Sequence, residues 1–170
     1  MSIFSKIIKI DSSDDDYDFS ELYDAIKTSD LDTVKDIIKK NKKLLYEKDE
    51  YGFTVIHAVA STDDEEVANF VLKRRNDVNI KNNDGIAALH NVMYPEIAKI
   101  LIGSGADVNI IDNDGNTPLH IQASDGEERF DVIEILLAHG ADKSVKNKRG
   151  QRAYDIAISR EDKDNAKILK

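Results

Sequence analysis

A short motif returns four times along the 170-residue chain, and this recurrence limits the folds that the chain can adopt. The four copies are Tyr51-Gly-Phe-Thr-Val-Ile-His57, Asp84-Gly-Ile-Ala-Ala-Leu-His90, Asp114-Gly-Asn-Thr-Pro-Leu-His120 and Arg149-Gly-Gln-Arg-Ala-Tyr-Asp155. Their glycines are 33, 30 and 35 residues apart. A period of this length is typical of arrays in which one supersecondary unit stacks on the next.

Each unit predicts two helices and a turn. Thr117 followed by Pro118 is typical of a helix start, because a side-chain oxygen can cap free amides and proline fits the first helical turn. A second apolar segment follows, and Gly105 and Gly140 stand where such a helix would end in a left-handed residue. The Asp-Gly pair at 84–85 predicts a tight turn. One such unit cannot bury its apolar face alone, so neighbouring units must stack.

Three segments carry a resemblance to a known family: Gly-Asn-Thr-Pro-Leu-His at 115–120, Gly-Ala-Asp-Val-Asn at 105–109 and Ile-Leu-Leu-Ala-His-Gly-Ala-Asp at 135–142. They resemble the ankyrin repeat family, over residues 20 to 165 or so. The resemblance implies an all-α solenoid of about five helix-turn-helix-hairpin units, including two degenerate caps. We expect a flexible acidic tail at 1–19 and an ankyrin repeat domain at 20–170, divided into an N-terminal cap repeat at 20–48, repeats at 49–81, 82–111 and 112–146, and a C-terminal cap repeat at 147–170.

The units differ from one another in ways that affect packing. The unit at 82–111 lacks three residues between its helices, and the next unit has two extra residues within 125–129. Arg75 stands where the pattern has glycine, so we expect a strained or differently shaped helix end there. Ser20 and Asp30 are expected to be the N-caps of the first two helices.

Acidic and amide residues at Asp112, Asp114 and Asn116 alternate like the start of an EF-hand loop. Such a loop needs glycine at its sixth position and glutamate at its twelfth, and this segment has neither in place. A turn is therefore the favoured interpretation, and calcium is a remote one.

The histidines His57, His90 and His120 occupy the same place in three successive units. Equivalent atoms of stacked helices lie ~8–10 Å apart, whereas zinc needs its ligand nitrogens at ~2.1 Å. We therefore expect each ring to hydrogen-bond the backbone and tie repeat to repeat, and we expect neither a metal nor another cofactor.

Sequence signals of catalysis and of membrane association are both lacking. The chain has no cysteine and none of the common nucleophile-elbow, phosphate-loop or zinc-protease motifs. We expect a protein that is not an enzyme, with a metal-dependent enzyme as a remote alternative. No apolar run approaches the ~20 residues of a membrane span, and the N-terminal ten residues make a poor secretion signal, so we expect a cytoplasmic monomer.

The charge is unevenly distributed along the chain, whose net charge is −9. Residues 49–142 carry eighteen acids and six bases, whereas residues 143–170 carry nine bases and four acids. An acidic middle disfavours nucleic acid and favours a partner protein with a basic surface.

The resemblance also implies where a partner binds. In ankyrin proteins, residues beside the turn glycines and at the ends of the first helices usually contact the partner on the concave face. Tyr51, Phe53 and Ile86 are apolar at such positions and are the expected anchors. The matching partner-binding residues are Glu50, Tyr51, Phe53, Asn83, Asp84, Ile86, Asn113, Asp114, Asn116, Asp125, Lys148 and Arg149.

The function expected from this pattern is non-catalytic binding of another protein on the concave hairpin and first-helix face. The alternative is an immunity or inhibitor protein that neutralises a toxin or enzyme stoichiometrically. This alternative is motivated by the small size and the acidity of the chain, and the fold does not identify the partner because a repeat fold is shared by many functions.

Overall fold

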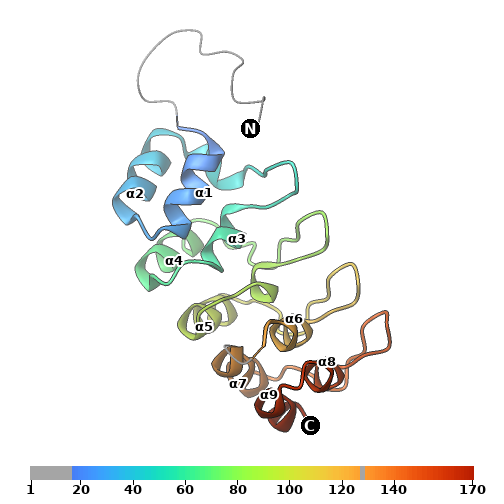
Figure 1. Cartoon of the computed structure of the whole chain (residues 1–170). Helices are drawn as coiled ribbons and strands as arrows, with labels where there is room; N and C mark the ends of the chain where they lie inside the picture. The colour runs from blue at the N-terminus through green and yellow to red at the C-terminus, as the bar shows by residue number, and fades with distance from the viewer. Residues whose placement is uncertain (1–16, 127–128) are drawn as a thin grey trace, which may run out of the picture.

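The computed structural model describes residues 17–126 and 129–170, and over these residues it consists of helices and turns without a β-strand. Helix pairs stack from one end of the array to the other (Figure 1). The elements are α1 (Phe19–Lys27), α2 (Leu31–Lys40), the 3-10 helix η1 (Lys42–Tyr46), α3 (Val55–Val59), α4 (Glu65–Leu72), the 3-10 helix η2 (Ala88–His90), α5 (Pro95–Gly103), α6 (Pro118–Asp125), α7 (Phe130–Ala138), α8 (Ala153–Ser159) and α9 (Lys163–Leu169). The all-α solenoid expected from the sequence is confirmed.

The helices form two layers, because first helices stack on first helices and second helices on second helices. Helix α1 contacts α3, which contacts η2, and α6 lies between η2 and α8. In the other layer, α2, α4, α5, α7 and α9 follow in order. Apolar side chains at equivalent positions, such as Ile56, Leu89 and Leu119, are buried between the layers in one continuous core. No helix in the described part of the chain is long and apolar enough to cross a membrane.

The first helix begins two residues earlier than expected, and its N-cap is Asp18. The Asp18 side chain accepts a hydrogen bond from the amide of Glu21, whose carboxylate accepts one from the amide of Asp18 in return. Ser20 lies inside the helix, so the N-cap prediction for Ser20 was wrong, since a reciprocal pair outcompetes a lone hydroxyl. The expected cap at Asp30 is confirmed by its bond from the amide of Thr33.

The expected tail at 1–19 overlaps this helix. Tyr17 packs against the edge of the core, and Tyr17 and Phe19 are both partly buried. The remainder of the predicted tail, residues 1–16, lies outside the described residues.

The shortened third unit keeps only a single turn of its first helix. The 3-10 helix η2 ends at His90, Tyr94 is the N-cap of α5, and Pro95 is the first residue of that helix. Gln122 reaches over from α6 and donates to the carbonyl oxygens of His90 (2.9 Å) and Val92 (3.1 Å). A side chain of the next repeat therefore supplies the hydrogen bonds that a longer helix would have supplied.

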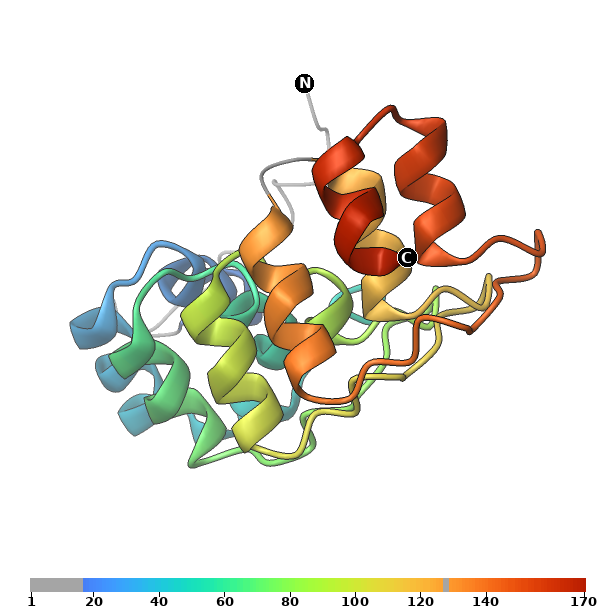
Figure 2. The same ribbon diagram turned by 90° about the horizontal axis from the view of Figure 1, so that it is seen from below.

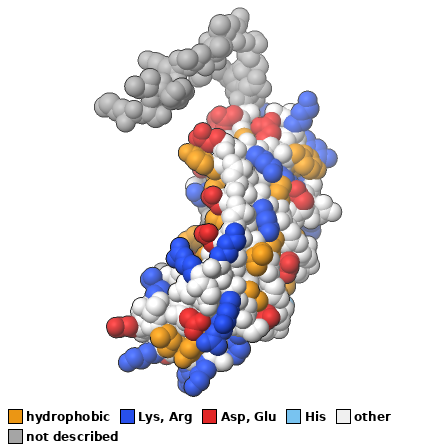
Figure 3. Space-filling view, turned by 90° about the vertical axis from the view of Figure 1, so that its right-hand side faces the viewer, with side chains coloured by type: hydrophobic (Ala, Val, Ile, Leu, Met, Phe, Trp, Pro, Cys, Tyr) orange, Lys and Arg blue, Asp and Glu red, His pale blue; other side chains and the backbone are white. Residues whose placement is uncertain are grey.

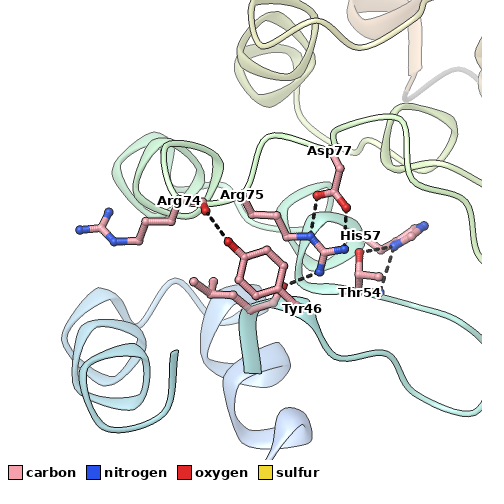
Figure 4. Close-up of polar contacts among 7 residues, drawn as sticks. Tyr46, Thr54, His57, Arg74, Arg75 and Asp77 are labelled. Carbon is pink, nitrogen blue, oxygen red and sulfur yellow. Dashed lines mark hydrogen bonds and ion pairs between the residues drawn. The ribbon is translucent and has the colours of Figure 1, made fainter. Parts of the chain in front are cut away.

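The helix end at Arg75 is differently shaped rather than strained. Its backbone is not in the left-handed region, and the residue is only 4% exposed. Nε and Nη2 donate to the Asp77 carboxylate at 2.6 and 2.8 Å, and Nη1 donates to the carbonyl oxygen of Leu45 (Figure 4). The guanidinium also lies 5.5 Å from the centre of the Tyr46 ring. A buried arginine thus joins the second repeat to the N-terminal cap repeat.

Candidate protein-binding face

Each hairpin is built around one acidic or amide side chain three residues before its turn glycine. Oδ1 of Asp112 accepts hydrogen bonds from the amides of Asp114 and Asn116, both at 2.8 Å. Oδ1 of the equivalent residue accepts the same two bonds in the other three hairpins, which contain Asp49, Asn82 and Asn147. The carboxylate of Asp112 therefore has a structural role in the turn, which explains the pattern that resembled a calcium loop.

The four hairpin tips are joined to one another by backbone hydrogen bonds. The amide of Asn83 donates to the carbonyl oxygen of Tyr51, that of Asn113 to Asp84, and that of Lys148 to Asp114, each at 2.9 Å. Figures 1 and 2 show the hairpins side by side along one edge of the array. We call the surface made by residues 50–53, 83–86, 113–116 and 148–151 the tip face. Its backbone is fixed by this ladder before any partner binds.

The recurring histidines tie each repeat to the next one. In His120, Nδ1 accepts from the amide of Thr117 (3.1 Å), so the ring proton is on Nε2 and is donated to the carbonyl oxygen of Gln151 (2.9 Å). Equivalent bonds connect His57 to Ile86 and His90 to Asn116. The expectation that these rings hydrogen-bond the backbone between repeats is confirmed.

The electrostatic state of these rings follows from their surroundings. Burial lowers the pKa of His57, His90 and His120, and it outweighs the carbonyl hydrogen bond that favours the charged ring. A neutral ring with one nitrogen donating and the other accepting has no lone pair left for a metal ion or for proton transfer.

Six of the predicted partner-binding residues are exposed with side chains that have no hydrogen bond or ion pair within the described part of the chain. Tyr51 is 61% exposed and is the one aromatic residue among these six. The six are Glu50, Tyr51, Asp84, Asp114, Lys148 and Arg149. These side chains are available to a partner without breaking any contact of the fold.

Four other predicted residues have structural partners. Asn83 and Asn113 donate from Nδ2 to the carbonyl oxygens of Glu50 (3.0 Å) and Asn83 (2.9 Å), which reinforces the ladder. Asn116 donates to the Asp112 carboxylate and accepts from Asn147. The carboxylate of Asp125 lies 3.5 Å from Nε of Arg129. These four side chains therefore stabilise the fold: three of them link the hairpins, and Asp125 pairs at the C-terminal end of α6.

The two remaining predicted anchors are partly covered by the fold. The Phe53 ring meets the His57 ring edge to face, with 5.2 Å between ring centres. Ile86 is also partly buried, and its carbonyl oxygen accepts the bond from His57. Phe53 packs against the histidine of the second repeat and Ile86 is partly buried, so both offer a partner less surface than Tyr51 does.

Charge changes sign along the tip face. The two residues before each turn glycine are Glu50-Tyr51, Asn83-Asp84, Asn113-Asp114 and Lys148-Arg149, so three tips are acidic and the fourth is basic. Lys48 and Lys81 flank the acidic tips, and the Lys81 ammonium donates to the carbonyl oxygen of Ile111. Figure 3 shows the side of the molecule on which the hairpins lie. On this side, Lys and Arg side chains are densest over the lower half, toward the C-terminal end of the array.

A hollow of about 320 Å³ lies where the basic tip meets helices α6 and α8. Its lining includes Ile121, Ile156 and Arg160 besides the predicted residues Asp114, Lys148 and Arg149. Ile121 and Ile156 could not be identified from the sequence, because isoleucines at helical spacing resemble core residues, and Arg160 lies outside the recurring motif. They come together only when α6 and α8, which contact each other, are stacked.

Comparison with known families agrees with this geometry. A family model described as ankyrin repeats (3 copies) matches residues 85–170, and one described as ankyrin repeat matches residues 51–83. No curated protein sequence matches the chain. Ankyrin repeats are generally protein-protein interaction modules and are typically not enzymes. Through its recurring motif, its stacked helix pairs and its aligned hairpins, the chain belongs to the ankyrin repeat family.

Proposed function

We propose that this chain is a non-catalytic module that binds another protein on the tip face, and that the partner presents a basic surface to the first three hairpins. The observation that carries the proposal is a set of uncommitted side chains, Glu50, Tyr51 and Asp84, on a backbone fixed by the hairpin ladder. A preformed surface loses little conformational freedom on binding, so its contacts are converted efficiently into affinity.

The residues of this surface have distinct roles in the proposal. Tyr51 is the anchor, because an exposed tyrosine supplies a large contact area with few rotatable bonds and a hydroxyl that can pair with the partner. Glu50 and Asp84 attract a basic surface before contact is made, which raises the association rate more than the final affinity. The acidic Asp114 extends this field to the third tip.

Non-catalytic action is supported by the way the reactive side chains are used. The three buried histidines are committed to carbonyl oxygens and amides, and the turn carboxylates accept amide hydrogen bonds. That the bound partner is a toxin or enzyme neutralised by this chain stays a prediction.

The test is to capture the partner with the immobilised chain and then to measure its dissociation constant for matched variants. The variant E50K/D84K reverses two charges on the tip face, and E65K/E134K reverses two on the exposed surface of α4 and α7, far from the hairpins in sequence. Tyr51→Ala and Tyr94→Ala form the aromatic pair, since Tyr94 is also exposed but lies at the start of α5.

We expect E50K/D84K to weaken binding at least tenfold, mainly through the association rate, and Tyr51→Ala to weaken it mainly through dissociation. The control variants E65K/E134K and Tyr94→Ala should bind within a factor of two of the wild type. Equal losses in the control variants, or none in the tip-face variants, would exclude the tip face as the binding surface.

A further inference from the structure

The hollow between α6 and α8 differs chemically from the rest of the tip face. Aliphatic side chains of Ile121 and Ile156 line it, and Lys148, Arg149 and Arg160 bring three cations to it. Among the described residues, Asp114 is the one carboxylate in the lining, so this lining carries more positive than negative charge. The ring of His120, which also lines it, adds no charge, because burial lowers its pKa and its Nε2 proton is donated to Gln151.

The arginines of the chain show that this hollow is unusual. The sequence has six arginines, all within the described residues. Arg74, Arg75, Arg129 and Arg152 use their guanidinium groups in hydrogen bonds to carbonyl or carboxylate oxygens. The other two guanidinium groups, those of Arg149 and Arg160, have no such partner in the described part of the chain, and both line the hollow.

An uncommitted arginine is well suited to one class of ligand. The planar guanidinium donates two parallel hydrogen bonds, which match the two oxygens of a carboxylate. The nearby hydroxyls of Ser124 and Ser159 donate to the carbonyl oxygens of Ile121 (2.8 Å) and Ile156 (2.7 Å) within their own helices. Beside these polar groups, the two isoleucines offer an apolar wall. The hollow therefore fits a carboxylate that is carried next to an apolar side chain.

We propose that this hollow binds an acidic residue of the partner protein, on a peptide segment in which an aliphatic residue lies beside it. The proposal rests on the proposed function and deepens it. The partner then meets two regions of opposite charge: Glu50 and Asp84 on the tip face contact a basic part of the partner, and Arg149 and Arg160 at the hollow contact an acidic part. Opposite charges at the two ends of one face set the direction in which the partner lies along the array.

The first experiment uses a defined probe and the whole chain. The fluorescein-labelled peptide acetyl-Asp-Glu-Leu-Asp-Glu-amide is titrated against the wild type and against R149Q/R160Q by fluorescence anisotropy. The matched control is K163Q/K167Q, which removes two positive charges from the exposed side of α9, outside the lining of the hollow. The peptide acetyl-Asn-Gln-Leu-Asn-Gln-amide has the same length without the carboxylates.

We expect the acidic peptide to bind the wild type and K163Q/K167Q with dissociation constants within a factor of two, and R149Q/R160Q at least tenfold more weakly. Backbone amide shifts of Asn116, Ser124 and Gln151 in a two-dimensional NMR titration should place the peptide at the hollow. Equal weakening in K163Q/K167Q, or equal binding of the amide peptide, would overturn the proposal, because recognition would then be diffuse or independent of carboxylates.

A second arm separates carboxylate recognition from phosphate binding. Sodium phosphate is added in place of sodium chloride at the same ionic strength. NMR shifts at the hollow with phosphate but none with the acidic peptide would overturn the proposal in favour of a phosphate site. Acidic peptide binding that survives phosphate with less than a twofold change supports it.

The variant E50K/D84K keeps the two proposals distinct. It leaves the hollow intact, so the acidic peptide should bind it as tightly as it binds the wild type. Loss of the captured partner from E50K/D84K tests the proposed function, whereas loss of the acidic peptide from R149Q/R160Q tests the inference about the hollow. Failure of one readout therefore leaves the other interpretable.

Discussion

Nε2 of His120 lies 2.9 Å from the carbonyl oxygen of Gln151, 31 residues further along the chain. The bond joins the first helix of one repeat to the hairpin of the next, and equivalent bonds from His57 and His90 make the same connection in the two preceding repeats. Each of these bonds needs a proton on Nε2, and each ring is neutral because its Nδ1 accepts a hydrogen bond from the amide three residues earlier. Protonation of these rings is therefore linked to the stability of the stack.

Lowering the pH from 7.5 to 5.0 should lower the free energy of unfolding. The folded-state pKa of each of the three histidines is below its ordinary value of 6.5, so the unfolded chain takes up more protons than the folded chain just below that pH. Stability is complete above about pH 6.5 and falls as the pH drops through the window between the two pKa values.

Urea denaturation at pH 7.5, 6.5, 5.5 and 5.0 measures this dependence, and nitrogen-15 spectra of the imidazole rings report the tautomer directly. The ion pair of Arg152 and Asp155 affects stability in a different pH range. The Arg152 guanidinium lowers the pKa of Asp155 to about 2, so the stabilisation from this pair is lost only as the pH falls below about 3.8. A free energy of unfolding that does not change between pH 7.5 and 5.0 would contradict the assignment of neutral, buried rings.

Arg75→Ala should destabilise the array by ~3 kcal/mol, because it removes a buried guanidinium and leaves the Leu45 carbonyl group without its donor. Arg75→Lys should recover part of this loss, since an ammonium keeps the charge but cannot form the paired bonds to Asp77. Urea denaturation followed by circular dichroism gives both values. Lys73→Ala, at an exposed neighbour, is the control and should change stability by less than about 0.5 kcal/mol.

Gly85→Ala should be strongly destabilising, whereas Gly103→Ala should be neutral or slightly stabilising. Gly85 has a φ of +78°, and an added Cβ would lie 2.6 Å from the backbone nitrogen of Asn113 in the next hairpin. We expect a loss of at least about 2 kcal/mol from strain and from displacement of the ladder.

Gly103 is the matched control within the same repeat. It is the last residue of α5, its φ is not in the left-handed region, and no atom of the described residues lies within 4 Å of an added Cβ. Alanine there restricts the unfolded chain without strain, which stabilises by up to ~1 kcal/mol. Similar melting temperatures for the two variants would show that the ladder does not constrain the second hairpin.

Gln122→Glu should destabilise the array more than Gln122→Met does. Methionine fills the same space but removes two buried hydrogen bonds to His90 and Val92, at a cost of ~2 kcal/mol. Glutamate places a negative charge against the same two carbonyl oxygens, in a side chain that is fully buried.

Protonation distinguishes the two variants of Gln122. A protonated carboxyl group can donate one hydrogen bond, so the difference between Gln122→Glu and Gln122→Met should shrink as the pH is lowered toward 4. The free energy of unfolding, measured for both variants at pH 7 and pH 4.5, tests this. A constant difference would mean that residue 122 is not held against the truncated helix.

Local features of this protein could be predicted from the sequence because they depend on residues near one another in the chain. Gly85 and Gly115 adopt positive φ values of 78° as their Asp-Gly pairs predict, and Pro95 and Pro118 begin helices. The repeat period then predicts the stack, because equivalent apolar positions must be buried against the next unit. The prediction for Ser20 was wrong through a local competition, since Asp18 forms a reciprocal cap with Glu21.

The candidate site could be predicted only in part. The sequence identifies the residues around the turn glycines, but it does not tell which of them are free. Asn83 and Asn113 resemble Asp84 and Asp114 in position and polarity, yet the amide groups donate to neighbouring hairpins, whereas the carboxylates have no partner among the described residues. This difference depends on the distance between adjacent hairpins, which is set by the packing of the helices behind them.

By itself, then, the sequence determined the repeated unit, its turns and the change of charge from acidic to basic tips. Tertiary structure alone decided that Arg75 is buried across a repeat boundary, that Gln122 completes the helix end of the preceding repeat, and that Arg149 and Arg160 line one hollow. The physical reason is that hydrogen bonds between repeats join residues 30 and 32 positions apart, and that the hollow exists only where α6 packs against α8. Their contacts depend on how successive units are stacked, which no local pattern specifies.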